Sequence, residues 1–214
     1  MGQFRHITTT EQRLLEQRGC CAESWERVMV ASDFSPEQLR AVRLEGDVSI
    51  GSNSYISYST LSNYSIGNNC RIDSVLRMEC RHASTFGNGV MVSTVNENGG
   101  RSIPIYNELT SQIAYIMAMM RNRVEANKEL QRKVMAESER LRSNVGRIED
   151  DVTILGVKFI REVNIGRGTT IEGASHLENG TILTNATIGV DVRAKSFIID
   201  NDATVESGAC IERC

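Results

Sequence analysis

Aromatic residues and proline are both scarce in this chain of 214 residues. Phe, Trp and Tyr together make up 5% of it, and there are 2 prolines against 17 glycines. So few rings argue against an aromatic-cored sandwich and against stacking platforms for nucleic-acid bases. A surplus of one charge is missing too, since 24 Lys and Arg stand against 27 Asp and Glu. Nothing electrostatic therefore indicates a nucleic-acid partner.

Metal-ligand spacings, targeting segments and long apolar runs are also absent from the sequence. The six cysteines form no C-x-x-C pair and no histidine pair accompanies them, so we predict no metal site. We expect reduced cysteines that serve as small apolar side chains. No apolar run approaches the ~18 residues of a membrane span, and the N-terminus lacks the apolar run of a signal peptide. These absences predict a cytoplasmic protein without a membrane span.

What is present is a repeat of seventeen residues that runs from Ile148 to the end of the sequence. Written in rows of seventeen, the chain shows three aliphatic columns and one of threonines: Ile148, Ile165, Ile182 and Ile199; Ile154, Ile171, Ile188 and Val205; Ile160, Leu177, Ala194 and Ile211; Thr153, Thr170, Thr187 and Thr204. The aliphatics of one row are spaced six, six and five residues apart. This spacing predicts three short strands per turn of a triangular parallel coil.

Each strand of such a coil sends one large aliphatic side chain into a narrow interior. Successive coils stack about 4.8 Å apart, so like residues form ladders. Gly166 and Gly189 suit tight corners. We expect the interior to have little room for aromatic rings.

A looser version of the same spacing occupies about residues 44 to 95. It runs through Ile50, Ile56, Leu61, Ile66, Ile72 and Met78, and Phe86 and Val92 extend it. Aliphatic–glycine pairs recur at Ile50-Gly51, Ile66-Gly67, Ile165-Gly166 and Ile188-Gly189. In these pairs and this spacing the sequence resembles the hexapeptide-repeat (trimeric LpxA-like) superfamily. The resemblance covers about 44–95 and 146–214, and it implies a mainly β fold, a parallel left-handed β-helix.

Helical segments precede and interrupt the repeat. We predict an N-terminal helical cap over 1–43, with one helix from Thr8, Thr9 or Thr10 to Arg18 and another from Pro36 to about Val42. Trp25 should pack this cap onto the first coil. Residues 105–145 read as a helical insertion, either one helix or a hairpin broken near 121–127.

Four segments follow from these boundaries: the cap at 1–43, a first β-helix block with a Gly/Asn-rich loop at 44–104, the insertion at 105–145, and a second β-helix block at 146–214. The last coil carries no capping segment, so we expect either a longer coil or another subunit to cover it.

A second resemblance is closer than that to the superfamily, but it implies no activity. The chain is similar to an uncharacterised bacterial family of longer hexapeptide-repeat proteins, known from Bacteroidetes and relatives and catalogued as a domain of unknown function. The residues that carry this resemblance are Gly19-Cys20 with Trp25 downstream, the stretches 86–90 and 96–101, and Gln112–Tyr115.

Two histidines are candidate catalytic residues. The superfamily resemblance implies acyltransfer with a histidine as general base, which removes a proton from the acceptor hydroxyl or amine. His176 precedes the inward Leu177 and should point outward, whereas His82 lies near the break in the repeat. For both, an ordinary exposed histidine is the alternative.

The Gly/Asn-rich loop supplies the candidate substrate-binding residues Asn88, Asn96, Glu97 and Arg101. Glycines beside polar residues permit the close backbone approach that phosphate or sugar recognition uses, and Arg101 can hold a phosphate or carboxylate. A turn built on Asn88-Gly89 and Asn98-Gly99 explains the same residues.

These observations lead to two hypotheses of function. The first is a transferase-like protein that acts on a sugar or nucleotide-sugar, with acyl-CoA as donor and, by resemblance, a homotrimer with sites between subunits. The second is a non-catalytic β-helical assembly or binding module that displays the helical insertion to a partner.

Overall fold

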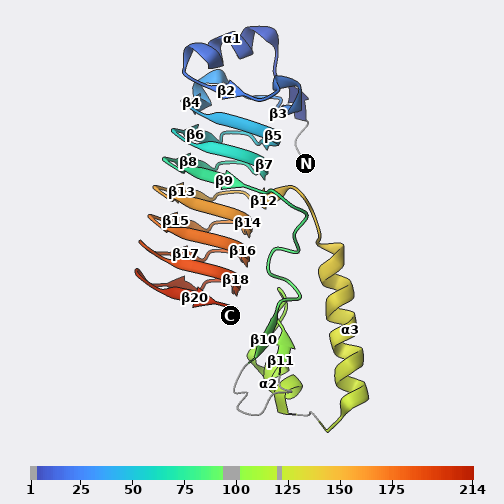
Figure 1. Cartoon of the computed structure of the whole chain (residues 1–214). Helices are drawn as coiled ribbons and strands as arrows, with labels where there is room; N and C mark the ends of the chain where they lie inside the picture. The colour runs from blue at the N-terminus through green and yellow to red at the C-terminus, as the bar shows by residue number, and fades with distance from the viewer. Residues whose placement is uncertain (1–3, 94–101, 120–121) are drawn as a thin grey trace.

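The computed structural model describes residues 4–93, 102–119 and 122–214 and is mainly β. Its strands stack one above another, with a small cap at one end of the stack and a helical arm beside it (Figure 1). Within the described residues the strands form a large sheet of 11, a sheet of 7 and a separate pair. Apart from two antiparallel pairs, the neighbouring strands in these sheets run parallel. No helix in these ranges is long and apolar enough to cross a membrane.

The bounds of the elements follow the chain through four groups. In the cap lie β1 (Phe4–His6), α1 (Thr9–Gln17), β2 (Cys21–Ala22), β3 (Val28–Ala31) and two 3-10 turns, Trp25–Arg27 and Pro36–Gln38. The large sheet continues with β5 (Arg43–Ile50), β7 (Thr60–Ile66), β9 (Arg77–Glu79), β12 (Gly146–Ile148), β14 (Phe159–Ile165), β16 (His176–Ile182), β18 (Arg193–Ile199) and β20 (Cys210–Glu212). The second sheet holds β4 (Leu39–Arg40), β6 (Tyr55–Ser57), β8 (Arg71–Asp73), β13 (Thr153–Leu155), β15 (Thr170–Glu172), β17 (Thr187–Ile188) and β19 (Thr204–Val205). The arm comprises β10 (Met91–Ser93), β11 (Ser102–Pro104), α2 (Ser111–Met119) and α3 (Val124–Arg140).

The seventeen-residue register is confirmed by the strand pairing. Ile148 pairs with Ile165, Ile165 with Ile182, and Ile182 with Ile199, so the first aliphatic column is a ladder of neighbours. The threonine column pairs in the same way, from Thr153 to Thr204. Ile154, Ile160, Ile171 and Leu177 are fully buried. A strand period of two then places the residues beside each of them outside.

The expectation that the interior has little room for rings is wrong. Tyr64 and Phe197 are fully buried in the coil core. Space for each ring comes from a glycine in the next coil: a Cβ on Gly146 would lie 2.4 Å from the Tyr64 ring, and one on Gly180 would lie 2.5 Å from the Phe197 ring. The Tyr64 hydroxyl also donates to the Val163 carbonyl at 3.0 Å and accepts from the Val163 N–H at 3.2 Å. A ring therefore fits where a neighbouring coil gives up its side chain.

The arm leaves the coils at one corner. Asn63, Glu162, Asn179 and Ser196 each turn a long strand with a left-handed φ of 46–55°. In the coil of β7, Asn63 alone connects Ser62 to Tyr64. On the neighbouring strands Glu79 lies beside Ser62 and Gly146 lies beside Tyr64, and the chain between these two is residues 80–145. The arm thus replaces a single corner residue, and the parallel stack continues on both sides of it.

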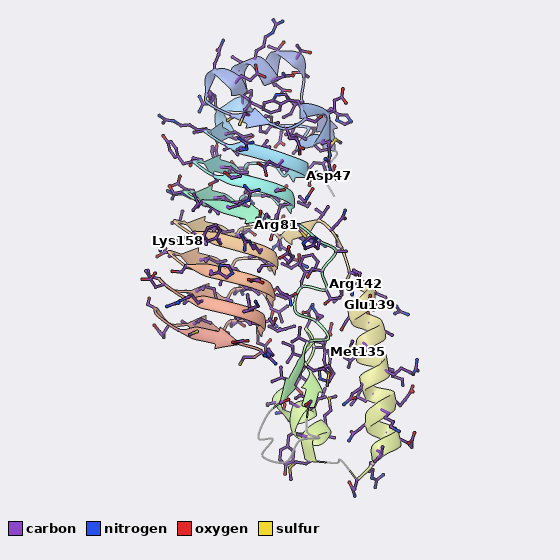
Figure 2. The ribbon with its side chains drawn as sticks, in the orientation of Figure 1. Asp47, Arg81, Met135, Glu139, Arg142 and Lys158 are labelled. Carbon is purple, nitrogen blue, oxygen red and sulfur yellow. The ribbon has the colours of Figure 1, made fainter. Side chains whose placement is uncertain are left out.

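The first repeat block is shorter than predicted. Phe86 and Val92 do not extend the coils, because Phe86 lies in a turn and Val92 lies in the antiparallel β10–β11 pair. Of the two alternatives for the insertion, the described residues agree with the broken one, since α2 and α3 are separate helices. Arg142 follows α3; it pairs with Glu139 and donates to the Ala83 carbonyl at 3.1 Å, which ties the end of the arm to its root (Figure 2).

The N-terminal segment contains the predicted first helix and several strands that the sequence does not predict. Thr8 caps α1 in a capping box with Glu11, and Trp25 packs against the core. The second predicted helix is only the 3-10 turn Pro36–Gln38, after which the chain enters β4. All six cysteines are free, but only Cys20, Cys70 and Cys80 are buried, so the prediction of apolar packing holds for half of them.

Candidate functional site

The outward residues that flank the third aliphatic column form a charged face on the large sheet. Along the stack, each coil places one residue before and one after the buried aliphatic, and the strand pairs align them. Leaving aside the uncharged Thr60 and Ser62 of β7, we call these residues the charged face: Arg43, Glu45, Arg77, Glu79, Phe159, Arg161, His176, Glu178, Arg193 and Lys195.

His176 is held in place on this face by a carboxylate. Its Nε2 lies 2.8 Å from Glu178 Oε2, and the imidazole lies 6.0 Å from the Phe159 ring, centroid to centroid. The hydrogen bond from His176 lowers the pKa of Glu178, and Lys195, 3.4 Å away, acts in the same direction. The ionised carboxylate can only accept a hydrogen bond, so in a neutral imidazole Nε2 is the donor to Glu178 and Nδ1 is the acceptor.

Next to His176 along the stack, arginines gather around one buried glutamate. Glu79 is 1% exposed and forms ion pairs with Arg77, with Arg81 at 2.8 Å and with Arg161 at 2.6 Å. Burial raises the pKa of Glu79, but the hydrogen bonds from the arginines outweigh it and the net shift is downward.

Arg77, Arg81 and Arg161, which we call the arginine cluster, keep hydrogen-bond donors that Glu79 does not use. Each of its three arginines contacts Glu79 through Nε, and Arg77 also reaches Glu45 at 2.8 Å. A guanidinium carries five donors in a planar fork, so most of them remain for an anion in solvent. Counted with their neighbours, Arg43, Arg77, Arg81 and Arg161 stand against Glu45, Glu79 and Glu162, which leaves a surplus of one positive charge that favours an anion.

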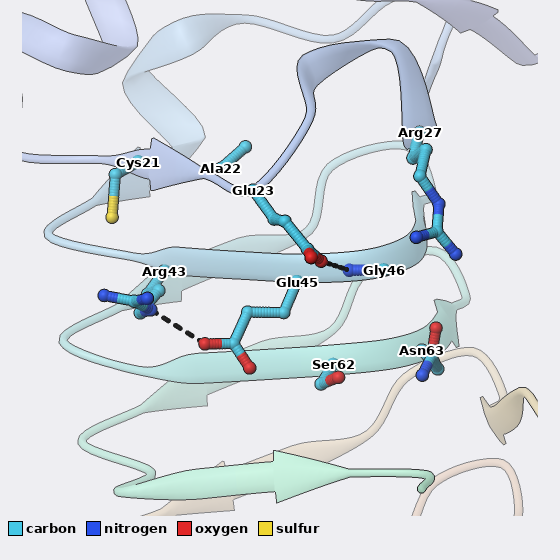
Figure 3. A pocket seen from close by; sticks show the side chains of 9 residues that line it. All are labelled: Cys21, Ala22, Glu23, Arg27, Arg43, Glu45, Gly46, Ser62 and Asn63. Atoms are coloured by element: carbon cyan, nitrogen blue, oxygen red, sulfur yellow. Dashed lines mark hydrogen bonds and ion pairs between the residues drawn. The ribbon is translucent and has the colours of Figure 1, made fainter. Parts of the chain in front are cut away.

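A cavity of about 450 Å³ lies at the cap end of the charged face. Figure 3 shows its walls: the Glu45 and Ser62 side chains stand on neighbouring strands, with Cys21 and Arg43 at one end and Arg27 and Asn63 at the other. Glu23 closes the wall by accepting from the Gly46 N–H at 3.1 Å. The lining mixes donors and acceptors, which suits a ligand with hydroxyl groups.

The cavity and His176 are separated along the stack. Ser62, Glu79, Arg161 and Glu178 succeed one another on adjacent strands. At about 4.8 Å per strand, His176 lies ~14 Å from the cavity, with the arginine cluster between them. A small ligand cannot touch both, but an extended one that lies along the face can.

The structure separates the two candidate catalytic histidines. His82 is exposed on the segment that leads into the arm, and His176 is half-buried on the charged face. Both stay predictions as catalytic residues, but only His176 has a carboxylate partner among the described residues.

The Asn88 side chain is enclosed by its own loop. It is 3% exposed, its Nδ2 donates to the Thr85 carbonyl at 3.0 Å, and its Oδ1 accepts from the Asn107 N–H at 2.9 Å. The loop packs on β16, where Thr181 Oγ1 donates to the Phe86 carbonyl at 2.7 Å. Asn96, Glu97 and Arg101 lie outside the described residues, so their predicted role in substrate binding stays a prediction.

The pairs that lie within one strand, such as His176 with Glu178, could have been found in the sequence as a pattern around the third column. Basic and acidic residues flank it as Arg43-Leu44-Glu45, Arg77-Met78-Glu79 and His176-Leu177-Glu178. Such a triplet predicts an ion pair on one strand face. The cluster around Glu79 needs the three-dimensional register, because Arg161 lies beyond the whole arm in sequence. No three His, Cys, Asp or Glu side chains group as a metal site in the ranges described.

Comparison with known proteins gives a family match along nearly the whole chain. The family described as "Domain of unknown function (DUF4954)" matches residues 4–60 and 53–214. An uncharacterised protein from Treponema pallidum (strain Nichols) is 24% identical over 223 residues, which cover 84% of this chain and 30% of that protein. The chain thus spans about a third of the length of this curated relative.

A solved structure with some similarity is the S84A mutant of AntD, an N-acyltransferase from Bacillus cereus in complex with dTDP-4-amino-4,6-dideoxyglucose and coenzyme A. It is 13% identical, and the match covers 96% of this chain and 87% of the other with a TM-score of 0.25. A similarity at that level supports no conclusion about this chain.

Proposed function

The chain belongs to the family of unknown function DUF4954. For this chain we propose the function of a transferase that acts on a sugar or nucleotide-sugar with an acyl-CoA as donor. We also propose that its coils form a left-handed β-helix of the hexapeptide-repeat type, which the seventeen-residue parallel register supports. The observation that carries the proposed activity is the His176–Glu178 pair beside the arginine cluster.

In this proposal His176 is the general base. Its Nδ1 takes the proton of the acceptor hydroxyl or amine as that group attacks the thioester carbonyl carbon. The carbon–sulfur bond then breaks, and the coenzyme A thiolate leaves and recovers the proton from the imidazolium. Ionised Glu178 at 2.8 Å holds the ring and stabilises the imidazolium that forms.

The arginine cluster serves the anionic part of the ligand. Both an acyl-CoA and a nucleotide-sugar carry a diphosphate. The guanidinium forks of Arg81 and Arg161 keep both terminal NH2 groups without a partner among the described residues, and Arg77, which also pairs with Glu45, keeps one. The diphosphate would lie on these forks with the reacting end at His176. The 450 Å³ cavity would take the other end.

Acetyl transfer from acetyl-CoA to a panel of nucleoside-diphosphate amino sugars tests the proposal. Product should be measured by mass spectrometry, because the exposed Cys21, Cys210 and Cys214 would react with a thiol reagent. His176→Ala should lower kcat roughly 10²–10⁴-fold, and His6→Ala is the matched control. Full activity of His176→Ala would contradict the role of His176 as the base. His82 would then be the remaining candidate, and the same assay on His82→Ala tests it.

A non-catalytic binding module is the second candidate, and the arm is the observation that favours it. Tyr115, Ile116 and Met119 of α2 are 66%, 47% and 54% exposed, an unusual amount of apolar surface for one short helix. Absence of both acetyl transfer and acetyl-CoA binding by calorimetry would favour this module. The trimer that the resemblance implies is tested by sedimentation: a clean monomer at micromolar concentration would remove any site shared between subunits.

A further inference from the structure

A second cavity lies on a different face of the coils from His176. It encloses about 720 Å³ and lies beside β12 and the ends of β5 and β7, on the far side of the corner marked by Asn63 and Glu162. Its volume falls in the roughly 300–1,000 Å³ range of small-molecule sites.

The floor of this cavity is a closed set of charged contacts. Asp150 Oδ1 accepts from the Asn68 N–H at 2.7 Å and Asn68 Nδ2 at 3.1 Å, and Asp150 Oδ2 accepts from Arg167 at 2.8 Å. The hydrogen bond from the Asn68 backbone is the largest cause that lowers the pKa of Asp150. Arg167 also pairs with Asp151 at 3.4 Å, so the charges of the floor are engaged in contacts with one another.

Arg147 is the group on the wall that remains unpaired. It is exposed on β12 and forms no ion pair with any residue in the described ranges. Beside it on the next strand, Ser65 accepts a hydrogen bond from Ser49 at 2.8 Å, which leaves the Ser65 hydroxyl hydrogen free to donate. An unpaired guanidinium next to a hydroxyl donor suits a carboxylate.

The rest of the lining fits a sugar ring. Phe4, which is 40% exposed, offers an apolar ring face at the cap side of the cavity. Glu149 Oε2 accepts from the Arg167 N–H at 3.1 Å, so its other oxygen can accept from a hydroxyl, and Thr184 adds a hydroxyl of its own. Acceptors, donors and a ring face then converge around one unpaired cation.

We propose that this cavity binds an oligosaccharide that contains a carboxylated sugar. Arg147 and Ser65 take the carboxylate, Glu149 and Thr184 contact hydroxyls, and Phe4 packs against a sugar ring. The site lies on a face other than that of His176, so it would hold a glycan independently of any transfer reaction.

Calorimetry with trigalacturonate, and with its fully methyl-esterified form as the neutral counterpart, tests this proposal on the full chain. The acid should bind and the ester should bind at least tenfold more weakly, because esterification removes the charge-assisted contact. Arg147→Ala should remove that difference, and Arg147→Lys should restore part of it. Arg71→Ala, an exposed arginine on the other sheet, should leave binding unchanged.

Three results would overturn the proposal: no binding of the acid, equal binding of acid and ester, or full binding by Arg147→Ala. Circular dichroism of each variant keeps misfolding apart from loss of binding. None of these measurements uses an acyl-CoA, so this proposal and the proposed transferase can fail separately.

Discussion

The coils and the arm are both rich in aliphatic residues, yet they treat them in opposite ways. In the coils Ile171 is fully buried and Leu177 is too, whereas in the arm Ile116 is 47% and Met119 is 54% exposed. The difference lies in what each side chain finds next to it. In the coils, Ile171 lies between the equivalent residues of the two neighbouring strands. In α2, which carries no charged residue, Met117 is the buried side chain. Apolar content alone does not predict burial; a repeat that supplies neighbours does.

The largest expected effect is a difference in stability between one substitution in the coils and one in the arm. Ile171→Ala should lower the free energy of unfolding by about 2–5 kcal/mol, because it leaves a cavity between two coils. Ile116→Ala in α2 should change it by less than about 0.5 kcal/mol. Repeat proteins often unfold in parts, so hydrogen exchange of β13 and β17 should accompany urea denaturation. Equal losses for the two variants would show that the arm is as tightly packed as the coils.

A smaller effect should follow from the buried Tyr64 hydroxyl, which joins two coils across the root of the arm. Tyr64→Phe leaves the Val163 N–H and C=O without their partner and should cost about 1–3 kcal/mol by urea denaturation. Tyr55→Phe, at a 54% exposed ring, is the matched control and should be nearly neutral. If both changes are neutral, the hydroxyl does not help to close the stack at this corner.

The smallest effect concerns acid stability of the cap. Hydrogen bonds from Arg5, followed by those from Thr8, lower the pKa of Glu11 from 4.5 to about 2. Because the folded pKa is the lower one, this stabilisation is present above pH 4.5 and is lost as the pH falls towards 2. Partial exposure limits it to about 1 kcal/mol. Thermal denaturation between pH 5 and 2 should show a shallower acid decline for Glu11→Gln than for the exposed control Glu37→Gln; identical slopes would contradict it.

Much of the coil architecture could be predicted from its period, whereas only the contacts within single strands of the charged face could. Ile148, Ile165 and Ile182 share a column in the sequence and a ladder in space, because parallel pairing aligns residues one coil apart. The cluster around Glu79 joins Arg77 and Arg161, which only become neighbours once residues 80–145 are set aside at a corner. His176 and Glu178 both flank Leu177, so their place on one outer face was predictable from the strand period.

The sequence by itself determined the parallel stack, its seventeen-residue register, a first helix that begins at Thr8, Thr9 or Thr10, and the helical character of the arm, since these depend on local period and capping. Only the tertiary structure decided where the arm leaves the coils, which rings enter the core and which charges meet on a face. Tyr64 is buried because Gly146 leaves room for its ring, although the two lie on opposite sides of the arm in sequence. Contacts of that kind depend on which residues the folded chain brings together, and no local pattern contains that information.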